Sequence, residues 1–152
     1  MPRAYFRVYR RRHGQTLFNF PSLSPPRDGM ASYLYPMKKI YHLSTCSTCQ
    51  RIIKELNPGD DVELQDIKTQ PITEAQIDQM AEKSGSYEAL FSRRAMKYKS
   101  MGLKDKQLSE QDYRQLILDE YTFLKRPVII VNNQVFVGNS KKEVESAMSA
   151  IS

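Results

Sequence analysis

Residues 38–56 read KKIYHLSTCSTCQRIIKEL, in which β-prone residues lead through a turn with two cysteines into a helical pattern. The run from Lys38 to Leu43 is typical of a buried strand. After the turn, Gln50 to Leu56 places three aliphatic side chains on one helical face. The turn holds both cysteines of the chain, Cys46 and Cys49, in a Cys-x-x-Cys motif. Two thiols between a strand and a helix can form and break a disulfide, so the stretch indicates redox chemistry.

The sequence beyond this stretch alternates between strand and helix patterns. Residues 62–67 predict a second strand, and residues 128–131 and 134–137, joined by Asn132-Asn133, predict a β-hairpin. Between them lies an insertion that is mostly helical, with short helices and loops over residues 85–103. The sequence identifies caps at the starts of three helices. Thr73 with Gln76 and Ser140 with Glu143 are predicted capping boxes, and Ser109, with Asp112 at the third helical position, is a predicted N-cap. The predicted order is β-α-β, a helical insertion, then β-β-α, which is an α/β fold.

Positive charge is concentrated in the first 36 residues. This segment holds six arginines, one aspartate and no lysine, whereas residues 37–152 carry 17 basic and 16 acidic residues. It also contains five of the eight prolines and seven aromatic residues without helical or strand periodicity. We expect residues 1–36 to be a disordered, dispensable basic extension and residues 37–152 to form the folded domain. The abrupt change favours a translation start at Met37, with a transit peptide or a phosphate-binding arm as alternatives.

The composition of the chain excludes several classes of protein. No stretch approaches the roughly 18 consecutive apolar residues of a membrane helix, and no early segment resembles a signal peptide, so we expect a cytoplasmic protein without a membrane partner. Direct nucleic-acid binding is not expected, because residues 37–152 are nearly neutral. Two cysteines are too few for a disulfide scaffold. No metal site is expected either, because residues 37–152 offer zinc only His42 besides the cysteine pair.

The placement of the cysteines predicts a different role for each. Cys46 stands at the expected helix start, where free backbone amides and the positive end of the helix dipole favour thiolate over thiol. We predict that Cys46 is the nucleophile. Cys49 lies one turn further on the same face, where its thiol can attack a sulfur adduct on Cys46 and close an intramolecular disulfide. The alternative is a pair of inert, buried thiols.

Four features occur together in the order of a known family: His42 four residues before Cys46, the Cys-x-x-Cys turn, Arg93-Arg94 in the insertion, and Arg126-Pro127 before the hairpin. On these residues, the stretch from Met37 to about Ile151 resembles the ArsC/Spx family of glutaredoxin-coupled arsenate reductases and Spx regulators. The resemblance implies a thioredoxin-like α/β fold with a mixed four-stranded sheet flanked by helices. We expect a monomer.

The resemblance also implies roles for the matching residues. Cys46 would attack arsenate and become linked to arsenic. Arg94 and Arg126 would bind the oxyanion through paired guanidinium donors, with Arg93 as the alternative alignment to Arg94. Pro127 would be the cis-proline that places Arg126 beside the dithiol.

Two further positions qualify this resemblance. A histidine at the place of His42 would raise the thiolate population of Cys46, the alternative being an ordinary strand histidine packed under the sheet. Arsenate reductases of this type carry another arginine where this chain has Gly138. The regulators of the family keep a glycine there, together with a Cys-x-x-Cys pair.

Three functions therefore stay open. The first is a reductase of arsenate or another small oxidised substrate, without a bound cofactor, whose Cys46–Cys49 disulfide is reduced by an external thiol, either glutathione with glutaredoxin or thioredoxin. The second is a redox-sensing regulator that binds the α subunit of RNA polymerase. The third is a general thiol-disulfide reductase of protein or glutathione adducts.

Overall fold

The computed structural model describes residues 9–10, 16–17 and 37–152. The chain divides between residues 36 and 37 into two units. In the first unit, β1 (Tyr9–Arg10) pairs antiparallel with β2 (Thr16–Leu17). The prediction of a disordered and dispensable extension falls largely outside the described residues.

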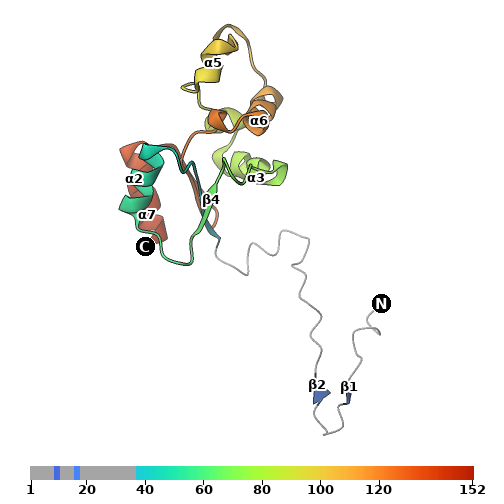
Figure 1. The fold of residues 1–152 in the computed structure, drawn as a ribbon, viewed down its shortest axis with the longest axis vertical. Helices are drawn as coiled ribbons and strands as arrows, with labels where there is room; N and C mark the ends of the chain where they lie inside the picture. The colour runs from blue at the N-terminus through green and yellow to red at the C-terminus, as the bar shows by residue number, and fades with distance from the viewer. Residues whose placement is uncertain (1–8, 11–15, 18–36) are drawn as a thin grey trace. The chain divides into compact units, whose positions relative to one another are not determined.

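The second unit is built on a mixed four-stranded sheet with the order β4-β3-β5-β6, and a ribbon drawing shows its helices (Figure 1). The strands are β3 (Lys38–His42), β4 (Glu63–Asp66), β5 (Val128–Val131) and β6 (Gln134–Val137). β3 pairs parallel with β4 and antiparallel with β5, and β5 pairs antiparallel with β6. The parallel pair requires a crossover, which α2 (Ser47–Leu56) supplies. The predicted α/β fold with a mixed four-stranded sheet is confirmed.

The other helical elements form the insertion and the C-terminal end. They are α3 (Glu74–Ser84), α4 (Tyr87–Leu90), α5 (Met96–Ser100), η2 (Leu103–Asp105), α6 (Glu110–Asp119), η3 (Tyr121–Phe123) and α7 (Lys141–Ile151). The capping box predicted at Thr73 is formed, and the cap predicted at Ser109 forms a full box with Asp112. At Ser140 only half of the box forms. The hydroxyl accepts the Glu143 amide at 3.3 Å, but the Glu143 side chain does not return to the cap amide. Its carboxylate remains near the positive end of the helix dipole, which stabilises it there without that bond.

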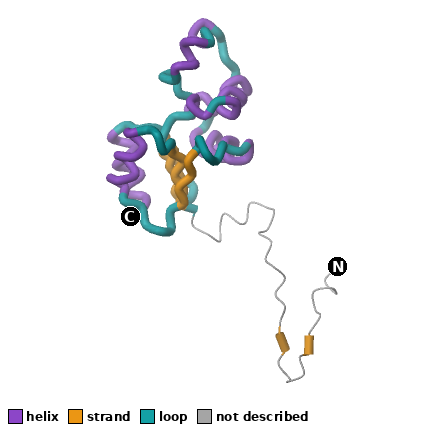
Figure 2. The backbone as a smooth tube through the Cα atoms, viewed as in Figure 1, coloured by secondary structure: helices purple, strands orange, loops and turns teal. Residues whose placement is uncertain are grey.

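Alternation along the strands divides the core into two clusters on opposite faces of the sheet. On one face, α2 and α7 pack over a cluster that contains Ile40, Ile52 and Ile129. On the other face, α3, α4 and α6 pack over a larger cluster that contains Tyr41 and Ile130. Figure 2 shows α2 and α7 on one side of the strands and the insertion helices on the other. The sheet is therefore buried on both faces, and the site lies where α2 and the insertion meet its edge.

The insertion helices are joined by one polar network. The Arg114 guanidinium on α6 donates from Nε to Asp78 Oδ1 of α3 at 2.7 Å and also reaches Glu74 Oε2 at 3.1 Å. The Tyr87 hydroxyl of α4 donates to the same Asp78 oxygen at 2.8 Å. Both donors hold the pKa of Asp78 below its usual value, the hydrogen bond from Arg114 contributing most. The network fixes α4 relative to α3 and α6, and thereby the segment that carries Arg93 and Arg94.

Candidate active site

Cys46 is the N-cap residue of α2, with extended backbone angles of φ −92° and ψ 112°. Its own amide donates to the Leu43 carbonyl at 3.0 Å, which closes the turn after β3. The first turn of α2 contains no acidic side chain, so the positive end of the helix dipole is not neutralised locally. Cys46 is half-buried and Cys49 is buried, and neither forms a disulfide. The predicted helix start is confirmed, although the helix begins at Ser47 rather than at Gln50.

The pKa of the Cys46 thiol is lowered by its surroundings. Partial burial acts in the opposite direction, but it is outweighed by hydrogen bonds from the backbone amide and thiol of Cys49, a bond from the Thr48 amide and the charge of Arg126. Each of these donors stabilises the thiolate form. Cys46 is therefore the more reactive of the two thiols at neutral pH.

The pKa of Cys49 is shifted in the opposite direction. Its side chain is 0% exposed, and this burial is the main cause that raises its pKa to about 11. The neighbouring Cys46 charge and hydrogen bond raise the pKa further. Cys49 is therefore protonated at neutral pH, and its thiol donates a hydrogen bond to the Cys46 sulfur.

Asp66 at the end of β4 holds the turn that precedes the dithiol. One carboxylate oxygen, Oδ1, accepts the Ser44 amide at 3.3 Å and the Lys68 amide at 3.1 Å. The hydrogen bond from the Ser44 side chain is the largest cause of the lowered pKa of Asp66. On the other side of the turn, the Gln50 side-chain amide donates to the Ser44 carbonyl. These bonds fix the turn without contacting the sulfur. No local sequence motif indicates the contact between Asp66 and Ser44, because this contact joins the ends of two neighbouring strands.

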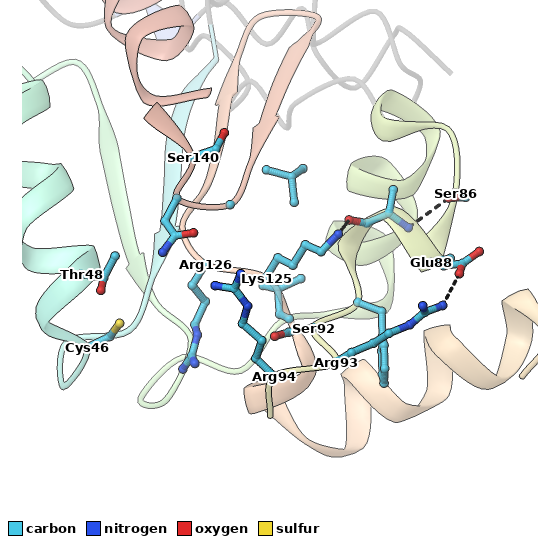
Figure 3. Close-up of a pocket in the computed structure, with 16 residues that line it drawn as sticks. Cys46, Thr48, Ser86, Glu88, Ser92, Arg93, Arg94, Lys125, Arg126 and Ser140 are labelled. Carbon is cyan, nitrogen blue, oxygen red and sulfur yellow. Dashed lines mark hydrogen bonds and ion pairs between the residues drawn. The ribbon is translucent and has the colours of Figure 1, made fainter. Parts of the chain in front are cut away.

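Cys46 opens into a pocket of about 790 Å³. Figure 3 shows Cys46 and Thr48 on one side of it, Arg94 and Arg126 next to them, and Glu88 on the far side. The lining side chains are mainly polar and come from the start of α2, the α4 region, the segment before β5 and the segment after β6: Cys46, Thr48, Ser86, Glu88, Ala89, Phe91, Ser92, Arg93, Arg94, Leu124, Lys125, Arg126, Val137, Gly138, Asn139 and Ser140.

Main-chain pairing brings the arginines from two distant segments together. Phe91 and Leu124 form an isolated antiparallel bridge. The Ser92 amide donates to the Phe123 carbonyl at 2.6 Å, and the Lys125 amide donates to the Leu90 carbonyl at 2.8 Å. These bonds place the chain just before Arg93 beside the chain just before Arg126, so that both segments reach one pocket.

The basic side chains of the pocket are not equivalent. Arg93 points to the far side and donates to Glu88 Oε1 at 2.6 Å, and it also reaches the Tyr113 hydroxyl at 3.5 Å (Figure 3). Lys125 donates to the Ala89 carbonyl at 2.9 Å. Arg94 and Arg126 form no ion pair with any residue that the structure describes. These two guanidinium groups are therefore the ones free to bind an anion next to Cys46.

The hairpin supplies the remaining wall. The Arg126–Pro127 peptide bond is cis, as the family resemblance implies. The Pro127 carbonyl accepts the Gly138 amide at 3.0 Å, which joins the segments before β5 and after β6. Gly138 has a φ of 97°, in the left-handed region, and no atom lies within 4 Å of the position of a Cβ there. Gly138 therefore leaves open space on the pocket wall.

The structure brings together most of the residues predicted from the sequence. Cys46, Arg93, Arg94 and Arg126 line the pocket, whereas His42, Cys49 and Pro127 do not. In the alternation of β3, His42 shares a face with Ile40, on the side of α2 and α7, and it pairs in register with Asp66. Its side chain forms no hydrogen bond with either cysteine in the part of the chain that the structure describes.

Several lining residues were not predicted, notably Thr48, Lys125, Asn139 and Ser140. Thr48 lies inside the Cys-x-x-Cys motif, Lys125 and Asn139 adjoin Arg126 and Gly138, and Ser140 was predicted only as a helix cap. Adjacency to Arg126 and Gly138 is the signal that could have identified them. Neither a group of metal-ligating side chains nor a helix able to cross a membrane occurs within residues 9–10, 16–17 and 37–152.

A mixed four-stranded sheet with a dithiol at the start of its crossover helix and a cis-proline before the hairpin defines a thioredoxin-like protein. The model of the ArsC family matches residues 41–147, which is more than half of the chain, so the chain belongs to the ArsC family. A search of curated protein sequences gave no match.

Solved structures agree with this assignment at the level of the fold. An arsenate reductase from Vibrio cholerae superposes with a TM-score of 0.63 and 18% sequence identity, covering 76% of this chain and 98% of that chain. A possible arsenate reductase from Streptococcus mutans gives a TM-score of 0.56 and 27% identity over 70% and 92% of the two chains. An arsenate reductase-related protein from Brucella melitensis gives 0.57 and 20%, over 72% and 92%.

Proposed function

We propose that this protein is a thiol-dependent reductase in which Cys46 is the nucleophile and Cys49 the resolving thiol. One observation carries the proposal: a thiol with a lowered pKa opens into a pocket beside two unpaired arginines, with a second thiol hydrogen-bonded to it. Membership of the ArsC family and the likeness to arsenate reductases favour arsenate as the substrate.

The chemistry proceeds in two steps. The Cys46 thiolate bonds to the arsenic of arsenate, and one arsenic oxygen leaves as water after protonation. Cys49 then attacks the Cys46 sulfur, so that a disulfide forms, the sulfur–arsenic bond breaks and its electron pair stays on arsenic. Arsenic is thereby reduced from As(V) to As(III), and the two thiols are oxidised.

The order of these steps follows from the coupling of the two thiols. Before the first step, the Cys46 charge helps to keep the pKa of Cys49 high, which suppresses a premature thiolate at Cys49. Covalent attachment to arsenic removes that charge from Cys46. One cause that raises the pKa of Cys49 is then lost, while its burial, the largest cause, remains, so Cys46 reacts first and Cys49 second.

A single-turnover assay tests the proposal. The full chain is mixed with arsenate, arsenite is quantified, and the wild type is compared with Cys46→Ser, Cys49→Ser and Arg126→Lys. We expect no arsenite from Cys46→Ser, a trapped adduct in Cys49→Ser, and a loss in Arg126→Lys, because lysine keeps the charge but lacks the planar pair of donors. Arg51→Lys on the exposed face of α2 is the matched control. Absence of arsenite from the wild type with every thiol donor contradicts the arsenate proposal.

The size of the pocket favours a second substrate class. A volume of about 790 Å³ is in the range that encloses an organic ligand and exceeds the needs of one tetrahedral oxyanion. A mixed disulfide of a small thiol would fit the same dithiol chemistry. Release of the small thiol from such a substrate by the wild type, without arsenate reduction, would assign this function.

Gly138 favours a regulatory role as a third candidate. The open wall at this glycine and the Cys-x-x-Cys pair are the features that the sequence shares with Spx regulators. A pull-down with the RNA polymerase α subunit, under oxidising and reducing conditions, tests this candidate. Binding that changes with the state of the dithiol supports a regulator.

A further inference from the structure

The proposed reaction leaves a Cys46–Cys49 disulfide, and this inference rests on that function. Returning the disulfide to two thiols requires two electrons from a reductant. Cys49 is fully buried, whereas Cys46 opens into the pocket. The reductant must therefore reach the Cys46 sulfur, and a protein reductant must cover part of the pocket rim to do so.

The helix that follows the pocket residue Arg94 by two residues has an unusual surface. α5 contains no buried residue. Met96 at its start is 90% exposed, and Met101 at its C-cap is 46% exposed. The helix is attached mainly through the Tyr98 ring, which lies edge-on to Phe91 at 5.9 Å, and through an ion pair between Lys97 and Glu120. Figure 1 shows α5 beyond α6, at an end of the second unit. Its two methionines are flexible apolar side chains that are exposed on the surface.

Positive charge surrounds these methionines. Residues 96–106 contain four exposed lysines and only one acidic residue, Asp105. Of the four, Lys99, Lys104 and Lys106 form no ion pair with a described residue. The remaining described domain is nearly neutral, so this excess is local rather than general.

The basic segment begins beside the candidate active site. Met96 follows Arg94 by two residues, so their Cα atoms are at most about 7 Å apart. Arg94 itself lines the pocket into which Cys46 opens. A macromolecule that rests on the start of α5 therefore lies close to Arg94, one of the residues that line the pocket.

We propose that residues 96–106, the α5 surface, are the docking surface for an acidic protein dithiol that reduces the Cys46–Cys49 disulfide. The lysines attract an acidic face and orient it, and Met96 and Met101 are covered by its apolar centre. A nucleic acid would satisfy the lysines but would leave the methionines exposed to water. The combination of charge and apolar side chains therefore favours a protein.

The electron balance of the step is complete. A thiolate of the partner attacks the Cys46 sulfur, and Cys49 leaves as a thiolate that takes up a proton. The second thiol of the partner then attacks the partner's own sulfur in this mixed disulfide and releases Cys46 as a thiolate. The partner ends as a disulfide, and this chain ends as a dithiol.

Reduction kinetics of the oxidised full chain test the proposal. The chain is oxidised with diamide, and its reduction is followed with dithiothreitol and with thioredoxin or glutaredoxin, whichever protein reacts faster with the wild type. We expect Lys99→Glu/Lys104→Glu to lower kcat/KM for the protein reductant by about tenfold and Met96→Ser by about fivefold. The rate with dithiothreitol should stay within about twofold, because it needs no docking surface. The matched control is Lys54→Glu/Lys142→Glu, which reverses two exposed charges on α2 and α7.

The outcomes separate this proposal from the proposed function. If dithiothreitol restores the dithiol but the α5 variants react with the protein reductant as the wild type does, the docking surface is wrong and the reductase stands. The same holds if neither protein reductant exceeds dithiothreitol. If no reducible disulfide forms in the wild type, the proposed function itself fails. Stronger inhibition by a short DNA duplex than by polyglutamate of equal charge would assign the α5 surface to nucleic acid.

Discussion

The two thiols of the candidate active site are expected to differ strongly in their rate of alkylation. Because the thiolate is the reacting form, the rate follows the ionised fraction. A thiol with the ordinary pKa of 9.0 is ionised to about 1% at pH 7, whereas Cys49, with its pKa raised to about 11, is ionised to about 0.01%. Cys49 is therefore expected to react about 100-fold more slowly than an ordinary thiol. Cys46, with its lowered pKa, is expected to react faster than one.

The assay measures each cysteine alone. Cys46→Ser leaves only Cys49 and Cys49→Ser leaves only Cys46, and each variant is treated with iodoacetamide from pH 6 to pH 10 under reducing-agent-free conditions. Intact mass gives the rate of alkylation. In Cys46→Ser the influence of the neighbouring thiolate is lost, but burial, the largest cause, remains, so the Cys49 profile still rises only above pH 9.

Two results would refute this reasoning. One is a similar rate for both cysteines at pH 7 in folded protein. The other is a pH profile for Cys49 with an apparent pKa below 9. A circular dichroism spectrum like that of the wild type is the control that each variant is folded, since an unfolded chain would expose Cys49.

Three further predictions concern anion binding and stability. Arg126→Ala is expected to weaken the inhibition of arsenate reduction by inorganic phosphate about tenfold or more, because one charge-assisted contact is lost. Arg93→Ala is expected to change this inhibition by less than about threefold, because the Arg93 guanidinium is already bound to Glu88. Inhibition constants for the two variants measure the difference, and equal losses contradict it. Ile52→Ala truncates a side chain of α2 that is 0% exposed, and it is expected to lower the free energy of unfolding by about 2–5 kcal/mol in a urea titration. Ile53 is only half-buried, so a smaller loss from Ile52→Ala than from Ile53→Ala refutes the packing assigned to Ile52. The reduced protein is expected to lose stability as the pH rises from about 9 to about 11, because the unfolded chain releases the Cys49 proton while the folded chain keeps it. Cys49→Ala should flatten this part of the plot of unfolding free energy against pH. An unchanged slope argues against a raised pKa of Cys49.

Local signals predicted most of the fold. The capping boxes at Thr73 and Ser109 depend on residues three apart, and the hairpin depends on a two-residue turn in which Asn132 adopts a φ of 55°. Such contacts are encoded within a few neighbouring positions. The return bond predicted at Ser140 failed because an N-cap hydroxyl and an acidic third residue permit a full box but do not require one.

The candidate site was predictable only in part. The Cys46–Cys49 pair lies within one turn of helix, so its arrangement follows from the sequence. The approach of Arg94 to Arg126 does not, because it depends on the bridge between Phe91 and Leu124, which lie far apart in the chain. The ion pair between Arg93 and Glu88 likewise depends on where α4 ends. The sequence does not specify that end, so it does not show which of the two adjacent arginines is free to bind an anion.

The hairpin has a consequence for engineering and for natural variation of this pocket. Arg126 precedes one strand and Gly138 follows the other, and Val128 is paired with Val137 directly beside them. A slip of the pairing by two residues would displace one wall against the other by about 6.6 Å, and a slip by one would turn the side chains of the slipped strand to the opposite face. The width of the pocket is thus set by the turn at residues 132–133, at the opposite end of both strands. Changes of turn length there are expected to alter which ligands fit, without replacing a single lining residue.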